Sequence, residues 1–214
     1  MIESFTNFLD MVGYIPSVIF DIGARDCVQS VEFSKKYPTS KVFAFEANPQ
    51  TIPLCKNTIQ NNPNIRLIEG AVHNYDGITS FHPIDTQRTR TTWKDGNPGA
   101  SSLFIANGSY PIETYIQNKI DIPCHRLDTI CKNENISPDI IWMDLQGAEL
   151  LALSSLGEYL NSCKYIYTEV SHKPIYEGQC MFSDVDSFLQ TRGFKRESIV
   201  NPYCWQEDVI YSKC

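Results

Sequence analysis

Apolar and polar residues alternate along this chain in a way that predicts strands and helices in turn. Short apolar runs indicate buried strands, and apolar residues spaced three and four apart indicate amphipathic helices. A repeated order of strand and helix is typical of a parallel sheet with helices on both faces. The runs that we interpret as strands cover residues 18–23, 41–47, 65–72, 77–84, 122–127, 140–144 and 164–170.

Helical spacing begins near the N-terminus, where Phe5, Phe8, Leu9 and Val12 fall at positions i, i+3, i+4 and i+7. We therefore expect a helix within residues 1–16 that lies on the sheet. The tail carries two strand-like pieces, which we interpret as an antiparallel pair that places one antiparallel strand near a sheet edge. Further helices are predicted at residues 26–36, after Pro49, at 128–136, at 149–156 and from 182 to a closing Gly193.

The periodic pattern dissolves between residues 85 and 111, a stretch rich in Thr, Gly, Asn, Pro and Ser. A connection this long inside a compact domain is either disordered or functional, so we expect a substrate loop here. The chain of 214 residues fits one domain, and nothing in the pattern divides it. The sequence thus predicts a single α/β domain over residues 1–214, with a mostly parallel sheet.

Composition and charge argue against several classes of function. The net charge of −7 argues against a nucleic-acid partner, which requires clustered Lys and Arg. No apolar segment approaches the roughly 20 residues needed to span a bilayer, so no membrane span is expected. The eight cysteines include no C-x-x-C pair, and several fall in predicted strands or helices. We therefore expect reduced cysteines and a cytoplasmic protein.

Candidate chemistry lies at the ends of the first two predicted strands. Asp21-Ile-Gly-Ala24 ends one apolar run, and Glu46 ends the next. A carboxylate there can accept hydrogen bonds from both hydroxyls of a ribose, and Gly23 lets a ligand lie against the backbone. The turn has one glycine where a pyrophosphate site has three, and Asp26 would repel a phosphate. S-adenosylmethionine fits this turn better than a dinucleotide, although a plain turn capped by acids remains an alternative.

At these residues the chain resembles the FkbM-type methyltransferases, a family of class I S-adenosylmethionine-dependent O-methyltransferases with a Rossmann-like fold. The resemblance covers about residues 18–194. The expected fold is a seven-stranded, mostly parallel sheet with one antiparallel strand in an edge region. The segments that carry the resemblance are Asp21-Ile-Gly-Ala24, Phe45-Glu-Ala-Asn-Pro49, Glu69-Gly-Ala-Val72, Ser101-Ser-Leu103, Arg126-Leu-Asp128, Asp144-Leu-Gln-Gly-Ala-Glu149 and Glu169-Val-Ser-His172.

The resemblance implies the positions of the cofactor. The first turn would line the methionine end, Glu46 would hold the ribose, and the residues after the third strand would flank the adenine. The family's first turn usually has a second glycine where Cys27 stands and often Asn where Arg25 stands, so Arg25 becomes a candidate partner for the cofactor carboxylate. The expected cofactor-binding residues are Asp21, Gly23, Ala24, Glu46, Ala47, Ala71, Val72 and Ser102.

Methyl transfer to a hydroxyl requires a group that removes its proton, a base or a metal ion. Asp144 and Glu169 end neighbouring predicted strands, which lie about 4.8 Å apart in a sheet. Together with His172 they predict a site for a divalent ion, Mg or Mn. We therefore predict Asp144, His172 and Glu149 as catalytic residues, and Asp144, Glu169 and His172 as metal ligands. A purely structural role for His172, or a helix-capping role for Glu149, is the alternative.

These observations lead to one functional hypothesis with three alternatives. The leading hypothesis is an O-methyltransferase that acts on a hydroxyl of a sugar or glycan, for example a terminal deoxysugar such as rhamnose, with S-adenosylmethionine as methyl donor. The sugar class is implied by the family resemblance. The alternatives are a methyltransferase of a polyketide or other small hydroxyl acceptor, a nicotinamide-dependent oxidoreductase, and a non-catalytic binding module. The sequence leaves the oligomeric state open.

Overall fold

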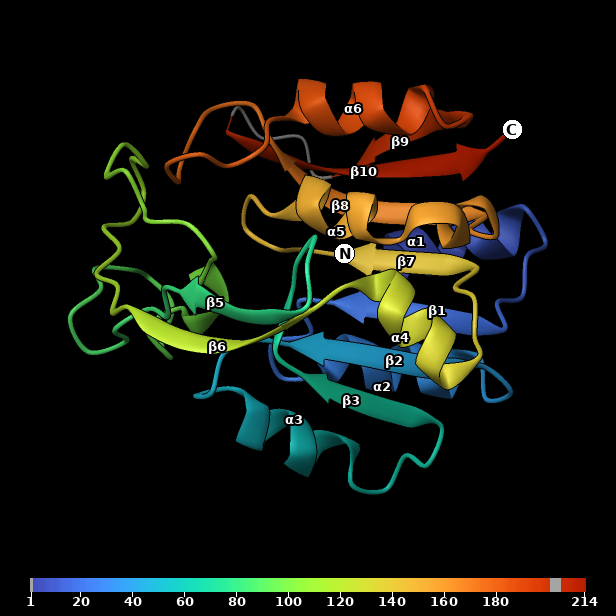
Figure 1. Ribbon diagram of the computed structural model, residues 1–214, viewed down its shortest axis with the longest axis horizontal. Coiled ribbons are helices and arrows are strands. Elements are labelled where there is room, and N and C mark those ends of the chain that lie inside the picture. The colour runs from blue at the N-terminus through green and yellow to red at the C-terminus, as the bar shows by residue number, and fades with distance from the viewer. Residues whose placement is uncertain (1, 201–204) are drawn as a thin grey trace.

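The computed structural model describes residues 2–200 and 205–214 and is built around a seven-stranded sheet (Figure 1). The strands follow the order β3-β2-β1-β7-β8-β10-β9. All neighbours are parallel except at β10, which lies antiparallel between β8 and β9. The predicted mostly parallel sheet with one antiparallel strand near an edge is thus confirmed. The strands are β1 (Val18–Ile22), β2 (Lys41–Glu46), β3 (Ile65–Glu69), β7 (Ile140–Met143), β8 (Tyr165–Ser171), β9 (Phe194–Val200) and β10 (Gln206–Lys213).

Helices cover both faces of this sheet, as the strand-helix alternation predicts. Strands with apolar side chains on both faces need cover on both. Three helices pack on the face that carries Ile19 and Trp142, and three on the face that carries Phe20 and Met143. The first group is α1 (Ile2–Met11), α2 (Val28–Lys36) and α3 (Ile52–Ile59), and the second is α4 (Leu127–Glu134), α5 (Glu149–Ser155) and α6 (Phe182–Gln190).

The N-terminal helix lies on the sheet as predicted. Phe5 and Leu9 of α1 are fully buried, and the Phe5 ring lies 5.5 Å from that of Tyr167 on β8. The apolar stripe is shorter than its sequence pattern indicates, because α1 ends at Met11 and Val12 is 43% exposed. In the described part of the chain, no helix is long and apolar enough to cross a membrane.

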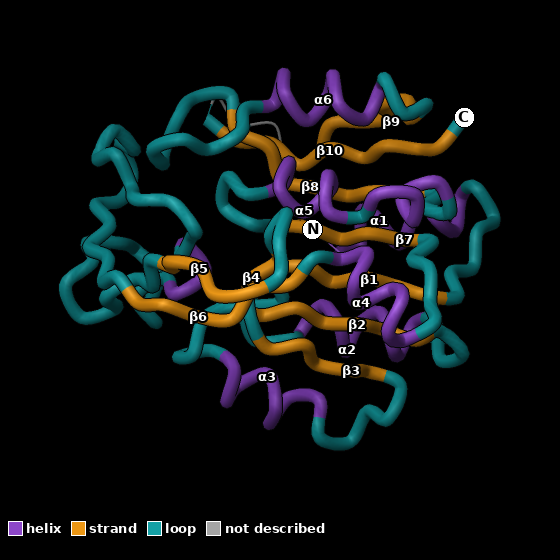
Figure 2. Tube along the Cα trace, in the orientation of Figure 1, coloured by secondary structure: helices purple, strands orange, loops and turns teal. Residues whose placement is uncertain are grey.

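A second, three-stranded sheet of order β4-β6-β5 stands beside the carboxyl edge of the main sheet (Figure 2). The apolar run 65–72 therefore does not form one strand, as predicted, but two strands in different sheets. Gly70 separates them with a φ of +129°, and a Cβ there would lie 2.8 Å from the carbonyl oxygen of Pro123. The strands of the second sheet are β4 (Ala71–Val72), β5 (Gly77–Phe81) and β6 (Ile120–His125).

The stretch between β5 and β6 is ordered by local contacts rather than by regular structure. Single bridges pair His82 with Ser102 and Arg90 with Thr114, and a short 3₁₀ turn, η1 (Pro98–Ala100), lies between them. Glu113 is 7% exposed and accepts hydrogen bonds from three neutral groups of the same stretch, including the Asn97 amide at 2.8 Å. The predicted substrate loop 85–111 therefore folds back over the carboxyl edge of the main sheet.

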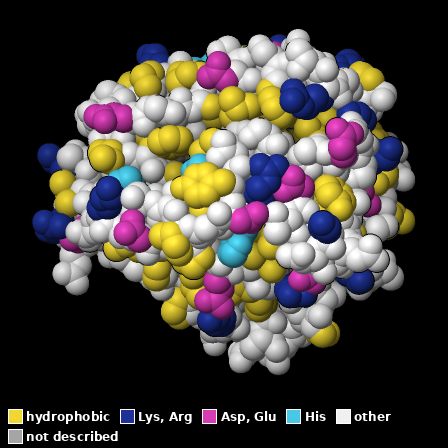
Figure 3. Space-filling model, in the orientation of Figure 1, with side chains coloured by type: hydrophobic (Ala, Val, Ile, Leu, Met, Phe, Trp, Pro, Cys, Tyr) yellow, Lys and Arg dark blue, Asp and Glu magenta, His cyan; other side chains and the backbone are white. Residues whose placement is uncertain are grey.

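The parallel register brings the ends of β1, β2 and β7 together at this edge. Ile22 of β1 pairs with Met143 of β7 and with Phe45 of β2, so the residues that follow these strands are neighbours. On the face shown in Figure 3, basic side chains are scattered among acidic and apolar ones.

Candidate functional site

A cavity of about 360 Å³ opens at the carboxyl edge of the parallel strands, beneath the stretch between β5 and β6. It runs from the ends of β1 and β2 to the ends of β7, β8 and the start of β10. Residues from the strand ends and from their cover line this cavity, among them Gly23, Arg25, Glu46, Ala47, Ala71, Val72, Ser102, Glu113, Asp144, Gln146, Tyr167, Glu169, Gln206 and Asp208.

The turn after β1 is shaped by the neighbouring strand. Gly23 has a φ of +90°, and a Cβ there would lie only 1.9 Å from the carbonyl oxygen of Asp144. The backbone N–H groups of Gly23 and Ala24 both donate to the carbonyl of Phe45, at 3.0 and 2.9 Å. Glycine is therefore required here because the end of β7 packs against the turn. This turn forms one end of the cavity.

The residues after Gly23 also have left-handed backbone conformations. Arg25 has a φ of 52° and Cys27 a φ of 59°. These are the two positions at which the family pattern favours Asn and Gly, the residues that adopt this conformation most readily. The chain keeps the conformation of the turn with residues that are less suited to it. The Arg25 guanidinium lines the cavity, where it forms an ion pair with Asp95 and lies 4.9 Å from the Trp93 ring centre.

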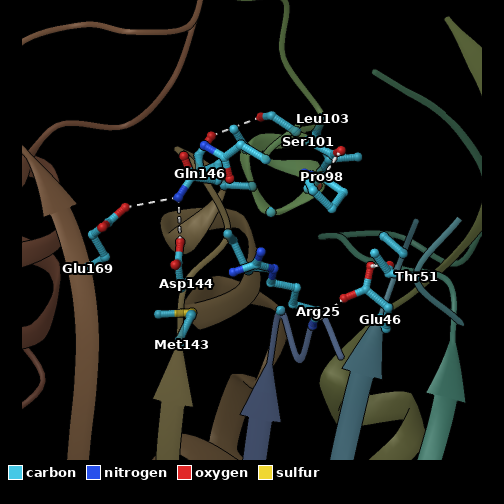
Figure 4. Close-up of a pocket in the computed structure, with 18 of the residues that line it drawn as sticks. Arg25, Glu46, Thr51, Pro98, Ser101, Leu103, Met143, Asp144, Gln146 and Glu169 are labelled. Carbon is cyan, nitrogen blue, oxygen red and sulfur yellow. Dashed lines mark hydrogen bonds between the residues drawn. The ribbon is translucent and has the colours of Figure 1, made fainter. Parts of the chain in front are cut away.

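Glu46 is held by three protein donors at the end of β2. It accepts the Arg25 N–H at 2.6 Å and the Thr51 hydroxyl at 2.9 Å (Figure 4). It also accepts the Asn48 N–H at 2.7 Å. Burial raises its pKa to about 7. A carboxylate offers about four acceptor positions, so this geometry leaves about one for a ribose hydroxyl rather than the expected two.

Asp21 and Ala24 lie behind the turn rather than in the cavity. Both are 1% exposed, and neither is among the cavity-lining residues. The Ser30 hydroxyl of α2 donates to Asp21 Oδ2, while Oδ1 has no hydrogen-bond partner in the described part of the chain. Burial raises the pKa of Asp21 to about 7. Contrary to expectation, the side chains of Asp21 and Ala24 do not line the cavity, and that of Asp21 lies beneath α2, where it meets Ser30.

The other expected cofactor contacts do line the cavity. Ala47, Ala71 and Val72 form an apolar slot next to Glu46, and the latter two are only 3% and 4% exposed. Ser102 closes the cavity from the side of the stretch between β5 and β6. Its hydroxyl donates to the carbonyl of Gln146 at 2.8 Å, which fastens the loop to the turn after β7.

Acidic residues meet at the far end of the cavity. Asp144 follows β7, and Glu169 of β8 lies opposite Asp208 of β10 in the strand register. The Gln146 amide donates to Asp144 Oδ1 at 2.7 Å and to Glu169 Oε2 at 3.0 Å, so it bridges the two carboxylates (Figure 4). The Gln206 amide donates to the same Glu169 oxygen at 2.6 Å.

These carboxyl groups are open to the cavity yet enclosed by protein. Enclosure by the chain is the main cause that raises the pKa values of Asp144 and Glu169. Nearby carboxylates raise them further: Glu149 and Asp208 raise that of Asp144, and Asp144 and Asp208 raise that of Glu169. Such groups take up protons at a higher pH than ordinary carboxylates. A carboxylate at the cavity surface with raised basicity is suited to accept a proton from a bound hydroxyl.

The predicted metal site is not assembled. The His172 ring pairs with Glu207 at 3.0 Å and packs on Phe182 of α6, at 4.9 Å between ring centres. Glu207 faces away from Asp208 because successive residues of a strand point to opposite faces. His172 thus lies across the sheet from Asp144 and Glu169, and no three His, Cys, Asp or Glu residues in the described part of the chain are placed to hold an ion.

Glu149 lies at the start of α5 but outside the cavity lining. It is 3% exposed, and its Oε1 accepts the backbone N–H groups of Leu145 at 2.9 Å and Gly147 at 3.2 Å. These bonds hold the turn that presents Gln146 to the cavity. The predicted catalytic role is not supported by this placement: the Glu149 side chain lies outside the cavity lining and holds the turn instead.

The sequence pattern that defines the Methyltransferase FkbM domain matches residues 21–196. The match covers most of the chain and includes lining residues from both ends of the cavity. This chain belongs to the FkbM methyltransferase family. It is therefore an S-adenosylmethionine-dependent methyltransferase, which sets aside the nicotinamide-dependent and non-catalytic alternatives.

One curated relative of this FkbM methyltransferase is the 2-O-methyltransferase NoeI of Sinorhizobium fredii. The two are 30% identical over 164 residues, which cover 76% of this chain and 66%, just under two thirds, of NoeI. Among solved structures, precorrin-6y C5,15-methyltransferase of Geobacter metallireducens has a TM-score of 0.52 at 14% identity, with 94% of this chain and 81% of that one covered. The fibrillarin pre-rRNA processing protein of Methanococcus jannaschii has a TM-score of 0.54 at 13% identity, with coverage of 92% and 66%. These structures confirm the Rossmann-like fold.

The cavity of the FkbM methyltransferase fits S-adenosylmethionine by its donor and acceptor groups. Glu46 has an acceptor position for a ribose hydroxyl, and the slot of Ala47, Ala71 and Val72 is apolar, as an adenine ring requires. Arg25, a cation, also lines the cavity, and a negatively charged group such as the cofactor carboxylate fits its charge.

Sequence reasoning missed three residues of the acidic end. Gln146 lies inside a recognised segment, but its backbone φ of 51°, which turns it toward the carboxylates, has no signal in the sequence. Gln206 and Asp208 lie in the predicted terminal hairpin. Strand alternation places them on one face, and only the pairing of β10 with β8 shows that this face is the one that carries Glu169.

Proposed function

We propose that this methyltransferase transfers a methyl group to a hydroxyl oxygen of a sugar or glycan, with Asp144 as the proton acceptor. The observation that carries the proposal is the position of Asp144, which follows β7, lines the cavity and contacts the cofactor turn through its own carbonyl at Gly23. A proton acceptor is needed because an alcohol is a poor nucleophile near neutral pH.

Several residues of the chain have separate roles in the proposed methyl transfer. When bound, S-adenosylmethionine supplies a methyl group that its positive sulfur already activates. Asp144 Oδ2 faces the hydroxyl and takes its proton as the oxygen attacks, while Gln146 fixes Oδ1. Glu149 and Asp208 support this role because their negative charges raise the pKa of Asp144. The cover formed by Ser102 and η1 excludes water from the reacting groups.

The sugar class is supported by the lining of the acceptor end and by the relative. Amides of Gln146 and Gln206 and the acids beside them can hydrogen-bond several hydroxyls at once, which suits a hydroxyl-rich acceptor. The rings of Tyr110 and Trp93 lie at the same cavity and offer apolar faces for a sugar ring. The 2-O-methyltransferase relative points to oxygen as the acceptor atom. A polyketide hydroxyl is the second candidate, favoured by the exposed apolar side chain of Ile112 at the cavity.

Transfer of labelled methyl from S-adenosylmethionine to a panel of oligosaccharides, polyketides and phenols tests the proposal. We expect label in sugar hydroxyls, and we expect D144N to lower kcat by about 10²-fold or more while the cofactor Kd stays unchanged. In the wild type, kcat should rise with pH as Asp144 loses its proton, over a range above that of an ordinary carboxyl group because its pKa is raised. Label only in polyketides or phenols would reject the sugar class, and a D144N variant with full kcat would reject the proton acceptor.

A further inference from the structure

Gln146 is held by two segments that are far apart in the sequence. Its backbone carbonyl accepts the Ser102 hydroxyl at 2.8 Å, and its side-chain oxygen Oε1 accepts the Tyr176 hydroxyl at 3.0 Å. Ser102 belongs to the stretch between β5 and β6, whereas Tyr176 belongs to the segment that follows β8. The side chain that bridges Asp144 and Glu169 is therefore itself fixed by its neighbours.

Tyr176 is buried next to Gln146 and does not face the cavity. It is 1% exposed and is not among the residues that line the cavity. Its ring stacks on that of Tyr115, at 6.1 Å between centres and 11° between planes, and its backbone N–H donates to the Gln179 side chain at 2.6 Å. Because the ring is fixed and closed off from the cavity, its hydroxyl can affect a bound acceptor only through a neighbouring group.

The Tyr176 hydroxyl has one hydrogen and two acceptors within reach. It donates to the carbonyl oxygen of Ala100 in η1 at 2.8 Å as well as to Gln146 Oε1 at 3.0 Å. Neither oxygen can donate in return, so the hydroxyl hydrogen is shared between them. The hydroxyl thereby joins the cover of the cavity to the amide that meets the two carboxylates.

The orientation of the Gln146 amide matters because its oxygen and nitrogen can exchange places by a half-turn. In the structure both N–H hydrogens are used, one on Asp144 Oδ1 and one on Glu169 Oε2 (Figure 4). The opposite orientation would turn the amide oxygen toward two carboxylate oxygens and repel them. A hydroxyl that donates to Oε1 on the other side favours the orientation that holds Asp144.

We infer that Tyr176 is a positioning residue of the methyl transfer, which acts through the Gln146 amide to hold the carboxylate of Asp144. With Oδ1 fixed, Oδ2 keeps the direction in which it meets the acceptor hydroxyl. Small errors in the direction of a reacting group lower the rate strongly. The inference rests on the proposed role of Asp144 as proton acceptor, and it adds a residue outside the cavity on which that role depends.

Y176F tests the inference, with Y211F as its matched control. Tyr211 of β10 is also fully buried, and its hydroxyl donates to Asp186 of α6 at 3.0 Å, outside the cavity lining. We expect Y176F to lower kcat about 10-fold, the effect of one lost hydrogen bond, while the acceptor KM and the cofactor Kd stay within about 2-fold. Y211F should keep the wild-type kcat, and urea titration should show a similar loss of stability in both variants.

A double-mutant cycle shows whether Tyr176 acts through Gln146. Q146M removes the amide and keeps the length of the side chain. We expect it to lower kcat at least as much as Y176F does, and we expect the double variant Y176F/Q146M to be no slower than Q146M alone. If Y176F slows Q146M as much as it slows the wild type, the two residues act independently and the inference is overturned.

A readout without turnover separates this inference from the proposed function. The side-chain NH₂ resonance of Gln146, assigned in ¹⁵N-labelled protein by its absence in Q146M, should exchange its hydrogens about 10-fold faster in Y176F and at the wild-type rate in Y211F. Wild-type exchange in Y176F, or faster exchange with wild-type kcat, would overturn the inference. Full kcat in D144N, together with faster exchange and lower kcat in Y176F, would reject Asp144 as the proton acceptor and keep Tyr176 as a positioning residue that acts on Glu169.

Discussion

Single residues in the first turn determine its packing and backbone conformation, which their motif does not indicate. From sequence, Gly23 makes room for a ligand, whereas in the structure it makes room for the Asp144 carbonyl. The family's preference for Gly and Asn at positions 27 and 25 has a similar cause, since both have a left-handed backbone. Non-glycine residues in that conformation cost on the order of 1–3 kcal/mol each, and the first turn contains two of them, Arg25 and Cys27.

Gly23→Ala tests this account of the turn. We expect it to lower the free energy of unfolding by more than 2 kcal/mol, because the new Cβ would displace the end of β7 as well as strain the backbone. Gly108→Ala is the matched control, with a φ of +77° and nothing within 4 Å of the added Cβ. Denaturant titration of both variants separates the two contributions. Equal losses would show that the contact with Asp144 costs nothing.

At the scale of elements, the sequence predicts most strands and helices, because their apolar patterns are strong and local. It fails where the outcome depends on distant partners. The run 65–72 is one apolar pattern, yet Gly70 divides it because Pro123 of β6 packs there. In the same way, His172 is close to Glu169 in sequence, but it lies on the other face of the sheet, where it pairs with Glu207.

His172→Ala should therefore have little effect on catalysis. We expect kcat and the cofactor Kd within about 3-fold of the wild type, and a stability loss of up to about 1 kcal/mol, since the pair with Glu207 is partly exposed. Steady-state kinetics and calorimetry measure these quantities. A loss of 10²-fold in kcat with unchanged stability would contradict the placement of His172 and return it to the active site.

At the scale of the whole molecule, buried acids make stability depend on pH. Asp21 and Glu46 have pKa values raised to about 7 in the folded protein, above their ordinary values of 3.8 and 4.5. The folded state therefore holds protons that the unfolded state releases. Their stabilising contribution is complete below about pH 4 and is lost as the pH rises toward and through 7.

For the cofactor-free protein, the free energy of unfolding should thus fall between about pH 4 and pH 7, by up to about 1.4 kcal/mol per pH unit for each group. Urea titrations at a series of pH values measure this slope. Asp21→Asn cannot ionise and should remove its share of the slope. A D21N variant with an unchanged slope would show that the pKa of Asp21 is the same in the folded and the unfolded chain.

The place of β10 in the sheet has a consequence for the order of assembly. β9 pairs with β10 and not with β8, although β9 is synthesised first. During translation the edge of β8 therefore stays open until residues 206–213 have emerged and can pair with it. Because the same pairing delivers Asp208 to the cavity, the acceptor end of the site is completed last, and a nascent chain halted after β9 would expose the β8 edge to pairing with other chains.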